Sequence, residues 1–152
     1  MSASIGQQAP DFTLRSTQGE ITLSQFQGDK AVAVVFYPFT FTSVCEGELC
    51  ALRDDLSIFE SEGVQVLAIS CDAAPAQKLW GEQNGWTFPV LSDFWPHGAV
   101  AQTYGVFNDK LGCANRATFL VDTSGKIVDS FDTPDLGTAR TMDRYKEALA
   151  KL

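Results

Sequence analysis

Four cysteines carry the most reactive side chains of this 152-residue chain. Cys45 follows an unbroken β-branched and aromatic run at 31–37 (AVAVVFY) and opens a segment whose apolar residues recur at helical spacing. A cysteine in the first turn of a helix lies beside unpaired backbone N–H groups and the positive end of the helix dipole, and both favour the thiolate over the thiol. Cys45 is therefore predicted to be a nucleophile. The other cysteines are Cys50, Cys71 and Cys113.

The segments that must position Cys45 alternate between strand and helix. Apolar runs predict strands at 31–37, 64–70, 89–91, 117–121 and 127–131, and helical patterns predict helices at 43–61, 74–84, 98–104 and 138–151. A short hairpin is expected where residues 12–14 and 21–23 flank Gln18-Gly19. The chain is therefore predicted to be a single α/β domain over residues 1–152. We expect a mixed central β-sheet with helices on both faces and an N-terminal β-hairpin.

The composition excludes several kinds of partner. There are 11 Lys and Arg residues against 19 Asp and Glu, and the formal charge of −8 repels nucleic acid and anionic lipid surfaces. The first residues do not resemble a secretory signal, and no apolar run reaches the length of a membrane span, so a cytoplasmic protein is expected. The cysteines are separated by 4, 20 and 41 residues, which does not fit the paired C-x-x-C ligands of a zinc site. No metal and no cofactor are expected.

A short motif around Cys45 carries a family resemblance. Pro38, Thr42 and Cys45 stand as P-x-x-x-T-x-x-C, which resembles the active-site motif of the peroxiredoxins (AhpC/TSA superfamily), and Glu48 also matches. The similarity extends over nearly the whole chain, through APDFTL at 9–14, LSDFWPHGAVAQTYGVF at 91–107 and NRATFLVD at 115–122, which supplies Arg116. Together these segments look most like the one-cysteine AhpE type. The resemblance implies a thioredoxin-like fold and a thiol-dependent peroxidase.

The resemblance also implies a role for each motif residue. The Cys45 sulfur attacks one oxygen of a peroxide O–O bond, which yields a cysteine sulfenic acid and releases water or an alcohol. Arg116 is expected to hold the thiolate and to donate hydrogen bonds to the peroxide oxygens. Thr42 is expected to orient the peroxide, a role compatible with that of a helix N-cap, and Pro38 to pack over the site. The expected substrates are hydrogen peroxide and organic hydroperoxides, with Glu48 as a supporting residue.

Cys50 is a departure from the AhpE type. Its C-x-x-x-x-C spacing from Cys45 matches the Q-type (bacterioferritin-comigratory) peroxiredoxins, whose second cysteine resolves the sulfenic acid as an intramolecular disulfide. On a helical wheel Cys50 lies roughly 140° from Cys45, near the polar face, which predicts an exposed thiol. Five residues of intact helix separate the two Cα atoms by roughly 7.5 Å, beyond the usual disulfide span of about 4.4–6.8 Å. Resolution by Cys50 therefore requires the helix to unwind locally. Two rival interpretations are that Cys113 resolves the sulfenic acid and that no cysteine of the chain does.

Other classes of function remain open from the residues alone. A thioredoxin-like disulfide oxidoreductase would need C-x-x-C, and a cysteine hydrolase would need His97 as its base; His97 is expected instead to be a structural or interface residue. A peroxide sensor would share the first chemical step. Cys71 continues the alternation of Leu67 and Ile69 along a strand and is expected to pack in the core. The family further implies a homodimer formed near Pro38 and residues 91–107, and reduction by thioredoxin or a glutaredoxin-like protein.

Overall fold

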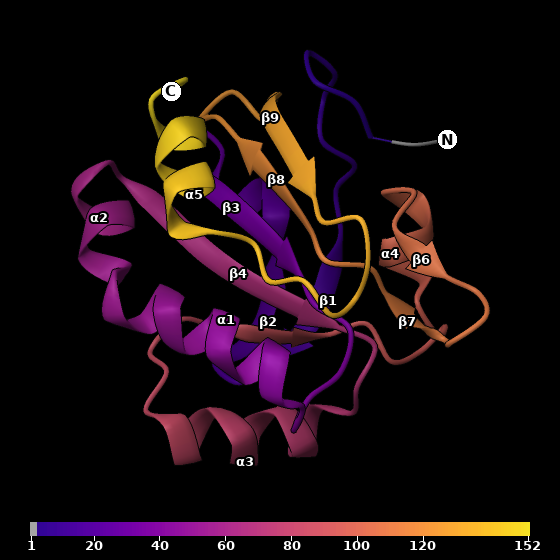
Figure 1. The fold of residues 1–152 in the computed structure, drawn as a ribbon. Coiled ribbons are helices and arrows are strands. Elements are labelled where there is room, and N and C mark those ends of the chain that lie inside the picture. Colours follow the sequence, from indigo (N-terminus) through magenta and orange to yellow (C-terminus); the bar gives the residue numbers. More distant parts are fainter. Residues whose placement is uncertain (1–2) are drawn as a thin grey trace.

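A seven-stranded mixed sheet runs through the computed structural model, which describes residues 3–152 (Figure 1). The strand order is β2-β1-β5-β4-β3-β8-β9. These strands are β1 (Thr13–Ser16), β2 (Gly19–Thr22), β3 (Ala31–Phe36), β4 (Val64–Ser70), β5 (Val90–Ser92), β8 (Ala117–Val121) and β9 (Ile127–Asp132). The predicted N-terminal hairpin is formed by β1 and β2, with Leu14 opposite Ile21.

β3 lies at the centre of the sheet because all six of its residues are apolar and buried. It pairs parallel with β4, with Phe36 opposite Ile69, and antiparallel with β8, with Phe36 opposite Ala117. β4 also pairs parallel with β5. The three parallel strands therefore end at the same edge of the sheet, and the loops that follow them lie together at that edge.

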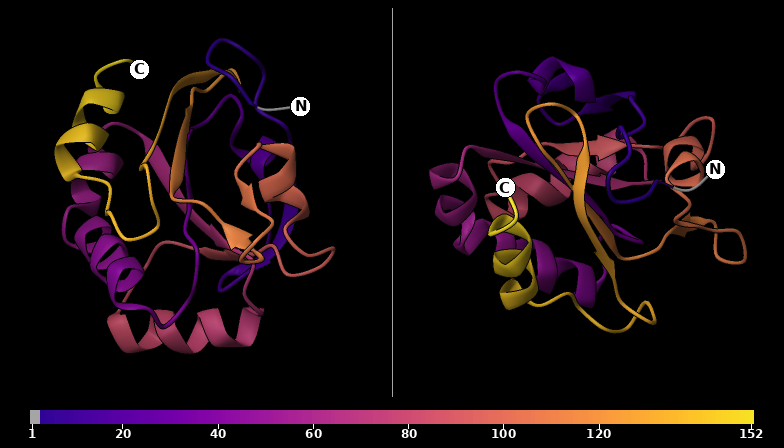
Figure 2. Two further views of the ribbon diagram at one scale, coloured as in Figure 1. Left: turned by 45° about the vertical axis from the view of Figure 1, so that its right-hand side comes forward. Right: turned by 90° about the horizontal axis from the view of Figure 1, so that it is seen from above.

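Helices cover both faces of the sheet, as predicted (Figure 2). One face packs against α1 (Ser43–Asp54), α2 (Leu56–Ser61), α3 (Ala74–Asn84) and α5 (Met142–Leu149). The other face packs against α4 (Ala99–Thr103), the 3₁₀ helix η1 (Leu23–Phe26) and the N-terminal segment. Cys45 is buried in the first of these two layers.

The single helix predicted at 43–61 is wrong, because the structure has two helices there. Asp55 lies between α1 and α2 with φ −106° and ψ 18°, outside the helical region. Two consecutive aspartates stand at this break, and aspartate favours helix ends over helix interiors because its carboxylate competes for backbone N–H groups. The apolar periodicity continues through the break, and for this reason the pattern did not reveal it.

The last helix is shorter than the predicted 138–151. α5 begins at Met142, after an N-cap at Thr141 whose hydroxyl accepts a hydrogen bond from the Arg144 N–H (3.2 Å). Before it, the Asp135 carboxylate accepts hydrogen bonds from the Gly137 N–H and the Thr138 hydroxyl, both at 2.9 Å. These contacts favour a turn over a helix, so residues 138–140 lie outside α5.

A small two-stranded sheet that the sequence did not reveal lies beside α4. It consists of β6 (Phe107–Asn108) and β7 (Cys113–Ala114), which pair antiparallel. Strands of two residues are too short for a periodic pattern to identify. Within residues 3–152, none of the helices has the length and apolar character needed to cross a membrane.

Candidate active site

Cys45 is the third residue of α1 and is fully buried. The first hydrogen bond of the helix runs from the Glu46 N–H to the Thr42 carbonyl oxygen, at 2.9 Å. Cys45 therefore lies in the first turn, where backbone N–H groups have no acceptor within the helix. Its position at the carboxyl end of β3 and the start of a helix is the predicted one.

The loop between β3 and α1 places Pro38 and Thr42 beside this helix start. Pro38 is buried, whereas Thr42 is exposed and occupies the N-cap position. The Thr42 hydroxyl does not cap the helix but donates a hydrogen bond to the Phe39 carbonyl oxygen (2.7 Å). Phe41 has φ 63°, a left-handed conformation that costs a non-glycine residue roughly 1–2 kcal/mol. Together these contacts bend the loop so that Thr42 directly precedes the turn that holds Cys45.

A buried ion cluster lies one helical turn beyond Cys45. The Glu48 carboxylate accepts hydrogen bonds from Arg116 Nη1 (2.7 Å), Arg140 Nη2 (2.8 Å), Arg140 Nε (2.9 Å) and the Arg140 backbone N–H (2.6 Å). The remaining guanidinium contacts go to the Leu136 carbonyl oxygen (2.7 Å, from Arg116) and the Thr118 hydroxyl (3.1 Å, from Arg140). Of the residues predicted from the sequence, the structure thus joins Glu48 to Arg116, and Glu48 follows Cys45 by three residues on α1.

The charges of this cluster shift the pKa values of its members. Burial acts to raise the pKa of Glu48, but the hydrogen bonds and charge of Arg140, with the charge of Arg116, lower it overall. Burial acts to lower the pKa of Arg140, but Tyr145, Glu48 and Cys45 raise it overall. Because Cys45 contributes to the raised pKa of Arg140, the two side chains lie in the same region of the structure.

Arg140 is the site residue that the sequence analysis missed. It lies 92 positions after Glu48, in the segment that was assigned to the last helix. One signal could have found it, because Thr141 is a good N-cap residue and predicts a helix that starts after Arg140. Nothing in the local sequence indicates that this arginine turns inward to meet Glu48.

Cys50 is half-buried, so the prediction of an exposed thiol is wrong. Its Sγ donates a hydrogen bond to the Asn84 side-chain oxygen (3.6 Å), and its side chain packs against the hydrophobic core. The C-terminal end of α3 covers this side of α1, which a helical wheel drawn for α1 alone cannot show. All four cysteines are free thiols in the structure.

Cys71 and Cys113 are both buried, as expected of core cysteines. Burial raises the pKa of Cys71 to about 12 and that of Cys113 to about 11. An electrostatic interaction with Cys45 contributes to the raised pKa of Cys113, so Cys113 lies near the site. Neither thiol ionises readily at neutral pH.

His97 is held by backbone groups. Its Nε2 atom hydrogen-bonds the Gly112 carbonyl oxygen (2.7 Å), its Nδ1 atom hydrogen-bonds the Phe94 carbonyl oxygen (3.2 Å), and its ring packs edge-on against Phe107. Because both ring nitrogens face carbonyl oxygens, neither is placed to accept a thiol proton. These contacts give His97 a structural role and argue against the hydrolase interpretation.

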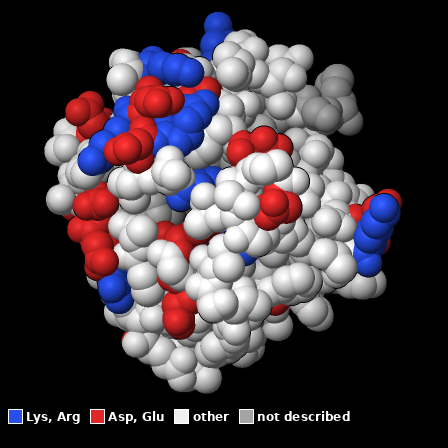
Figure 3. Space-filling model, viewed as in Figure 1, with Lys and Arg blue, Asp and Glu red and all other residues white. Residues whose placement is uncertain are grey.

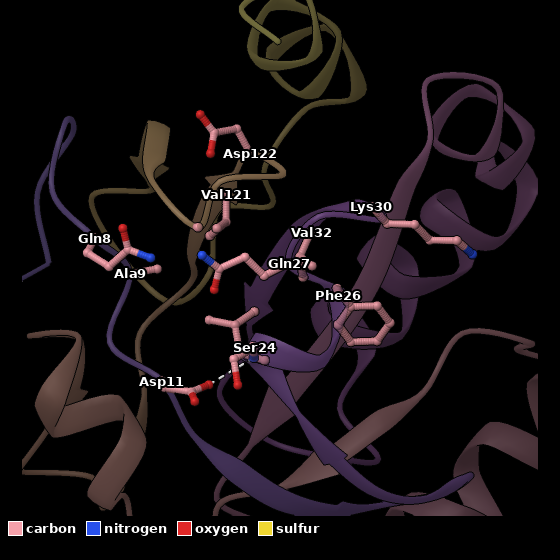
Figure 4. A pocket seen from close by; sticks show the side chains of 12 residues that line it. Gln8, Ala9, Asp11, Ser24, Phe26, Gln27, Lys30, Val32, Val121 and Asp122 are labelled. Atoms are coloured by element: carbon pink, nitrogen blue, oxygen red, sulfur yellow. Dashed lines mark hydrogen bonds between the residues drawn. The ribbon is translucent and has the colours of Figure 1, made fainter.

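A cavity of about 280 Å³ lies at the opposite end of β3 from Cys45 (Figure 4). Its walls include Val32 and Val121, which pair near the start of β3. The Asp122 carboxylate accepts backbone hydrogen bonds within its own turn, and the Lys30 side chain extends away from the other lining residues. This cavity is therefore separate from the site.

In the described part of the chain, no three or more His, Cys, Asp or Glu side chains are grouped to hold a metal.

The lowered pKa of Glu48 predicts a specific acid sensitivity. Because the folded-state pKa lies below the ordinary value of about 4.3, the carboxylate stabilises the fold fully above that pH and ceases to do so as pH falls through the lowered value. Urea unfolding between pH 7 and pH 3 should show a smaller acid-induced loss of stability for Glu48→Gln than for the wild type. Glu60→Gln, on the exposed surface of α2, is the control and should follow the wild type. Parallel curves for wild type and Glu48→Gln would contradict the prediction.

A buried cysteine at a helix start, one turn before a carboxylate that pairs with two arginines, suits an oxidoreductase that works through a thiol, and the mixed sheet covered by helices on both faces suits a thioredoxin-like fold. The family model described as AhpC/TSA family matches residues 5–130. The chain is 50% identical to alkyl hydroperoxide reductase E of Mycobacterium tuberculosis over 149 residues. The matched residues make up 97% of this chain and 97% of that one. The chain belongs to the AhpC/TSA family of peroxiredoxins.

Solved structures agree with this assignment. Reduced 2-Cys peroxiredoxin of Plasmodium vivax is similar with a TM-score of 0.87 and 28% identity, over 96% of this chain and 80% of that one. Peroxidoxin BcpB of Mycobacterium tuberculosis is similar with a TM-score of 0.85 and 30% identity, over 98% of this chain and 96% of that one. The predicted thioredoxin-like peroxiredoxin fold is therefore confirmed, and the protein is a thiol-dependent peroxidase.

Proposed function

We propose that Cys45 is the residue of this peroxidase that the peroxide substrate oxidises. Its thiolate attacks one oxygen of a peroxide, the O–O bond breaks, and the released oxygen takes a proton to leave as water or an alcohol. Cys45 is oxidised to a sulfenic acid while the peroxide is reduced. Arg116 and Arg140 are proposed to stabilise the negative charge that develops on the leaving oxygen.

One observation carries this proposal. The buried cluster beside Cys45 contains two guanidinium groups and one carboxylate, so it holds one positive charge in excess. Buried charge is costly unless it is paired. A thiolate at Cys45 supplies the missing negative charge, and Cys45 is also in the helix turn that favours an anion.

The proposed substrates are hydrogen peroxide and organic hydroperoxides. Thr42 and Phe41 are exposed where α1 begins, so a small molecule can approach the site past one hydroxyl and one aromatic ring. The matching relative is named as an alkyl hydroperoxide reductase, which supports an organic hydroperoxide as substrate. Both kinds of substrate are uncharged and are not repelled by the net charge of −8.

Cys50 is the proposed resolving residue. Its thiol attacks the sulfenic sulfur of Cys45, the S–O bond breaks, and the products are a Cys45–Cys50 disulfide and water. Burial raises the pKa of the rival Cys113 to about 11, which makes that thiol a poor nucleophile at neutral pH. The alternative is a one-cysteine cycle in which an external thiol protein reduces Cys45 directly.

Mass spectrometry of the reduced protein after one equivalent of hydrogen peroxide tests both steps. The expected result is a loss of two hydrogens, with a peptide that contains Cys45 joined to Cys50. In Cys50→Ser, the protein should instead gain one oxygen at Cys45, which a sulfenic-acid reagent traps. Cys71→Ala is the matched control and should behave as the wild type.

The outcomes separate the alternatives. A stable gain of one oxygen at Cys45 in the wild type would replace the two-cysteine cycle by the one-cysteine cycle. An unmodified Cys45 would remove the proposed reaction itself.

We also propose that the protein is a homodimer joined through its active-site edge. Large apolar side chains are exposed in the loops that follow β3 and β5 and on α3, namely Phe39, Phe41, Leu79, Phe94 and Trp95, the last at 82%. Lys and Arg on the face in Figure 3 gather over α5 and α2, and much of its lower half is uncharged. Apolar patches of this kind favour association. Sedimentation equilibrium should show a dimer at micromolar concentration; a monomer throughout would contradict it.

The proposed reductant is thioredoxin or a glutaredoxin-like protein, and the proposed location is the cytoplasm. Four unpaired thiols suit a compartment that keeps cysteines reduced. A disulfide or a sulfenic acid at Cys45 must be reduced by an external thiol before the next turnover, since two electrons are consumed with each peroxide.

A further inference from the structure

Asn84, the last residue of α3, contacts three positions on α1. Its side-chain nitrogen donates to Glu46 Oε1 (3.3 Å) and its side-chain oxygen accepts from Cys50 Sγ (3.6 Å). Its backbone carbonyl oxygen accepts from Arg53 Nη1 (2.8 Å). Glu46, Cys50 and Arg53 follow at helical spacing of four and three, so they form one stripe along α1. A single amide group therefore bridges the two ends of the segment 46–50.

The amide group is itself firmly held. Asn84 donates a second hydrogen bond to the Trp80 carbonyl oxygen (2.9 Å), one turn earlier on α3. Trp80 is fully buried, packs against Tyr37 and Trp86, and its Nε1 donates to the same Glu46 oxygen (3.2 Å). Asn84 and Trp80 are thus fixed on α3, and their hydrogen bonds hold the first turns of α1 in place.

A disulfide between Cys45 and Cys50 cannot form while these hydrogen bonds keep residues 46–50 helical. In an intact helix the two Cα atoms are separated by a rise of roughly 7.5 Å, whereas a disulfide needs about 4.4–6.8 Å and converging side chains. The segment between the two cysteines must therefore unwind. Unwinding displaces Glu46 or Cys50 from Asn84, so at least one of the two side-chain hydrogen bonds must break.

We propose that Asn84 is a positioning residue that controls how long the Cys45 sulfenic acid persists before Cys50 resolves it. The inference rests on the proposed function, in which Cys50 is the resolving residue. By holding Glu46 and Cys50 in the helical arrangement, Asn84 slows the attack of the Cys50 thiol on the sulfenic sulfur. A longer-lived sulfenic acid is available for a longer time to an external thiol or to a second peroxide.

Stopped-flow tryptophan fluorescence combined with acid quench and mass spectrometry tests this role. After one equivalent of hydrogen peroxide, Asn84→Ala should form the Cys45–Cys50 disulfide about tenfold faster than the wild type in the first-order phase, since two hydrogen bonds no longer oppose unwinding. The second-order reaction of Cys45 with peroxide should stay within about twofold of the wild type, because Asn84 does not touch Cys45. At excess peroxide, the variant should accumulate less sulfinic acid.

Two further variants sharpen the test. Gln83→Ala changes the exposed neighbour of Asn84 on α3 and should keep wild-type rates in both phases. Asn84→Asp retains an acceptor for Cys50 but places a second carboxylate against Glu46, so it should also accelerate disulfide formation. It carries the same test if Asn84→Ala does not fold.

The outcomes distinguish this inference from the function on which it rests. If the wild type and the Asn84 variants form the disulfide at the same rate, Asn84 does not control the rate of resolution and the inference is wrong. The proposed function stands in that case. If neither the wild type nor any variant forms the disulfide, the resolving role of Cys50 fails and the inference fails with it.

Discussion

Cys45→Ser should lose peroxide consumption by more than about 1,000-fold, the largest effect expected of any single substitution. A serine hydroxyl is not ionised at neutral pH and has no neighbouring base to activate it, so the attack on the peroxide bond has no nucleophile. The substitution leaves one buried positive charge unbalanced, but the Glu48 ion pairs with Arg116 and Arg140 do not include Cys45 and should keep the protein folded. The measurement is peroxide consumption with dithiothreitol as reductant, with circular dichroism as the check on folding.

The matched control is a cysteine outside the site. Cys71 is buried at the end of β4, and Cys71→Ala should retain activity within about threefold, at the cost of a small cavity. If Cys45→Ser keeps substantial peroxidase activity and Cys71→Ala loses it, the wrong cysteine has been assigned as the nucleophile.

Arg140→Met should lower the second-order rate constant for peroxide reduction by about 10²–10³, the range found when a single donor to a developing negative charge is removed. The substitution removes the excess positive charge beside Cys45 and two side-chain donors to Glu48. Arg140→Lys keeps the charge but cannot reproduce the forked contact to both carboxylate oxygens, so an intermediate loss of about tenfold is expected. Stopped-flow kinetics at a series of peroxide concentrations measures the constant.

Arg144→Met separates this effect from a general loss of stability. Arg144 lies on α5, four residues later, and forms a forked ion pair with Asp129 at 2.7 and 3.1 Å. Its removal should lower the free energy of unfolding without changing the rate constant by more than about twofold, because the pair does not touch the Glu48 cluster. Equal kinetic losses in the Arg140 and Arg144 variants would mean that the arginine at 140 acts only through the fold.

The local part of the site could be predicted from the sequence. Pro38, Thr42, Cys45 and Glu48 lie within one strand–loop–helix unit, where position along the chain determines position in space. β4, α3 and β8 likewise begin and end at the predicted residues, because long apolar runs and Gly85 mark their limits. Arg116 was found through the family resemblance and not from the pattern around it.

The distant part could not be predicted, because it depends on which elements pack together. Arg140 reaches Glu48 only because the segment before α5 crosses the start of α1 after the chain has folded. Cys50 is half-buried because the end of α3 lies against its side of α1, which no pattern along α1 can reveal. A pattern along one helix specifies directions around that helix, but the neighbour in each direction is a property of the tertiary structure.

The Glu48–Arg140 contact also has a consequence for how the protein is made. The two residues are 92 positions apart, and Arg140 directly precedes the N-cap residue of α5. During synthesis from the N-terminus, Cys45 emerges long before the arginine that completes its surroundings. In an unfinished or unfolded chain the cysteine is an ordinary thiol, with neither a helix turn nor a buried guanidinium beside it. In the proposed reaction, Cys45 therefore gains its full surroundings only once the segment that carries Arg140 has folded against α1.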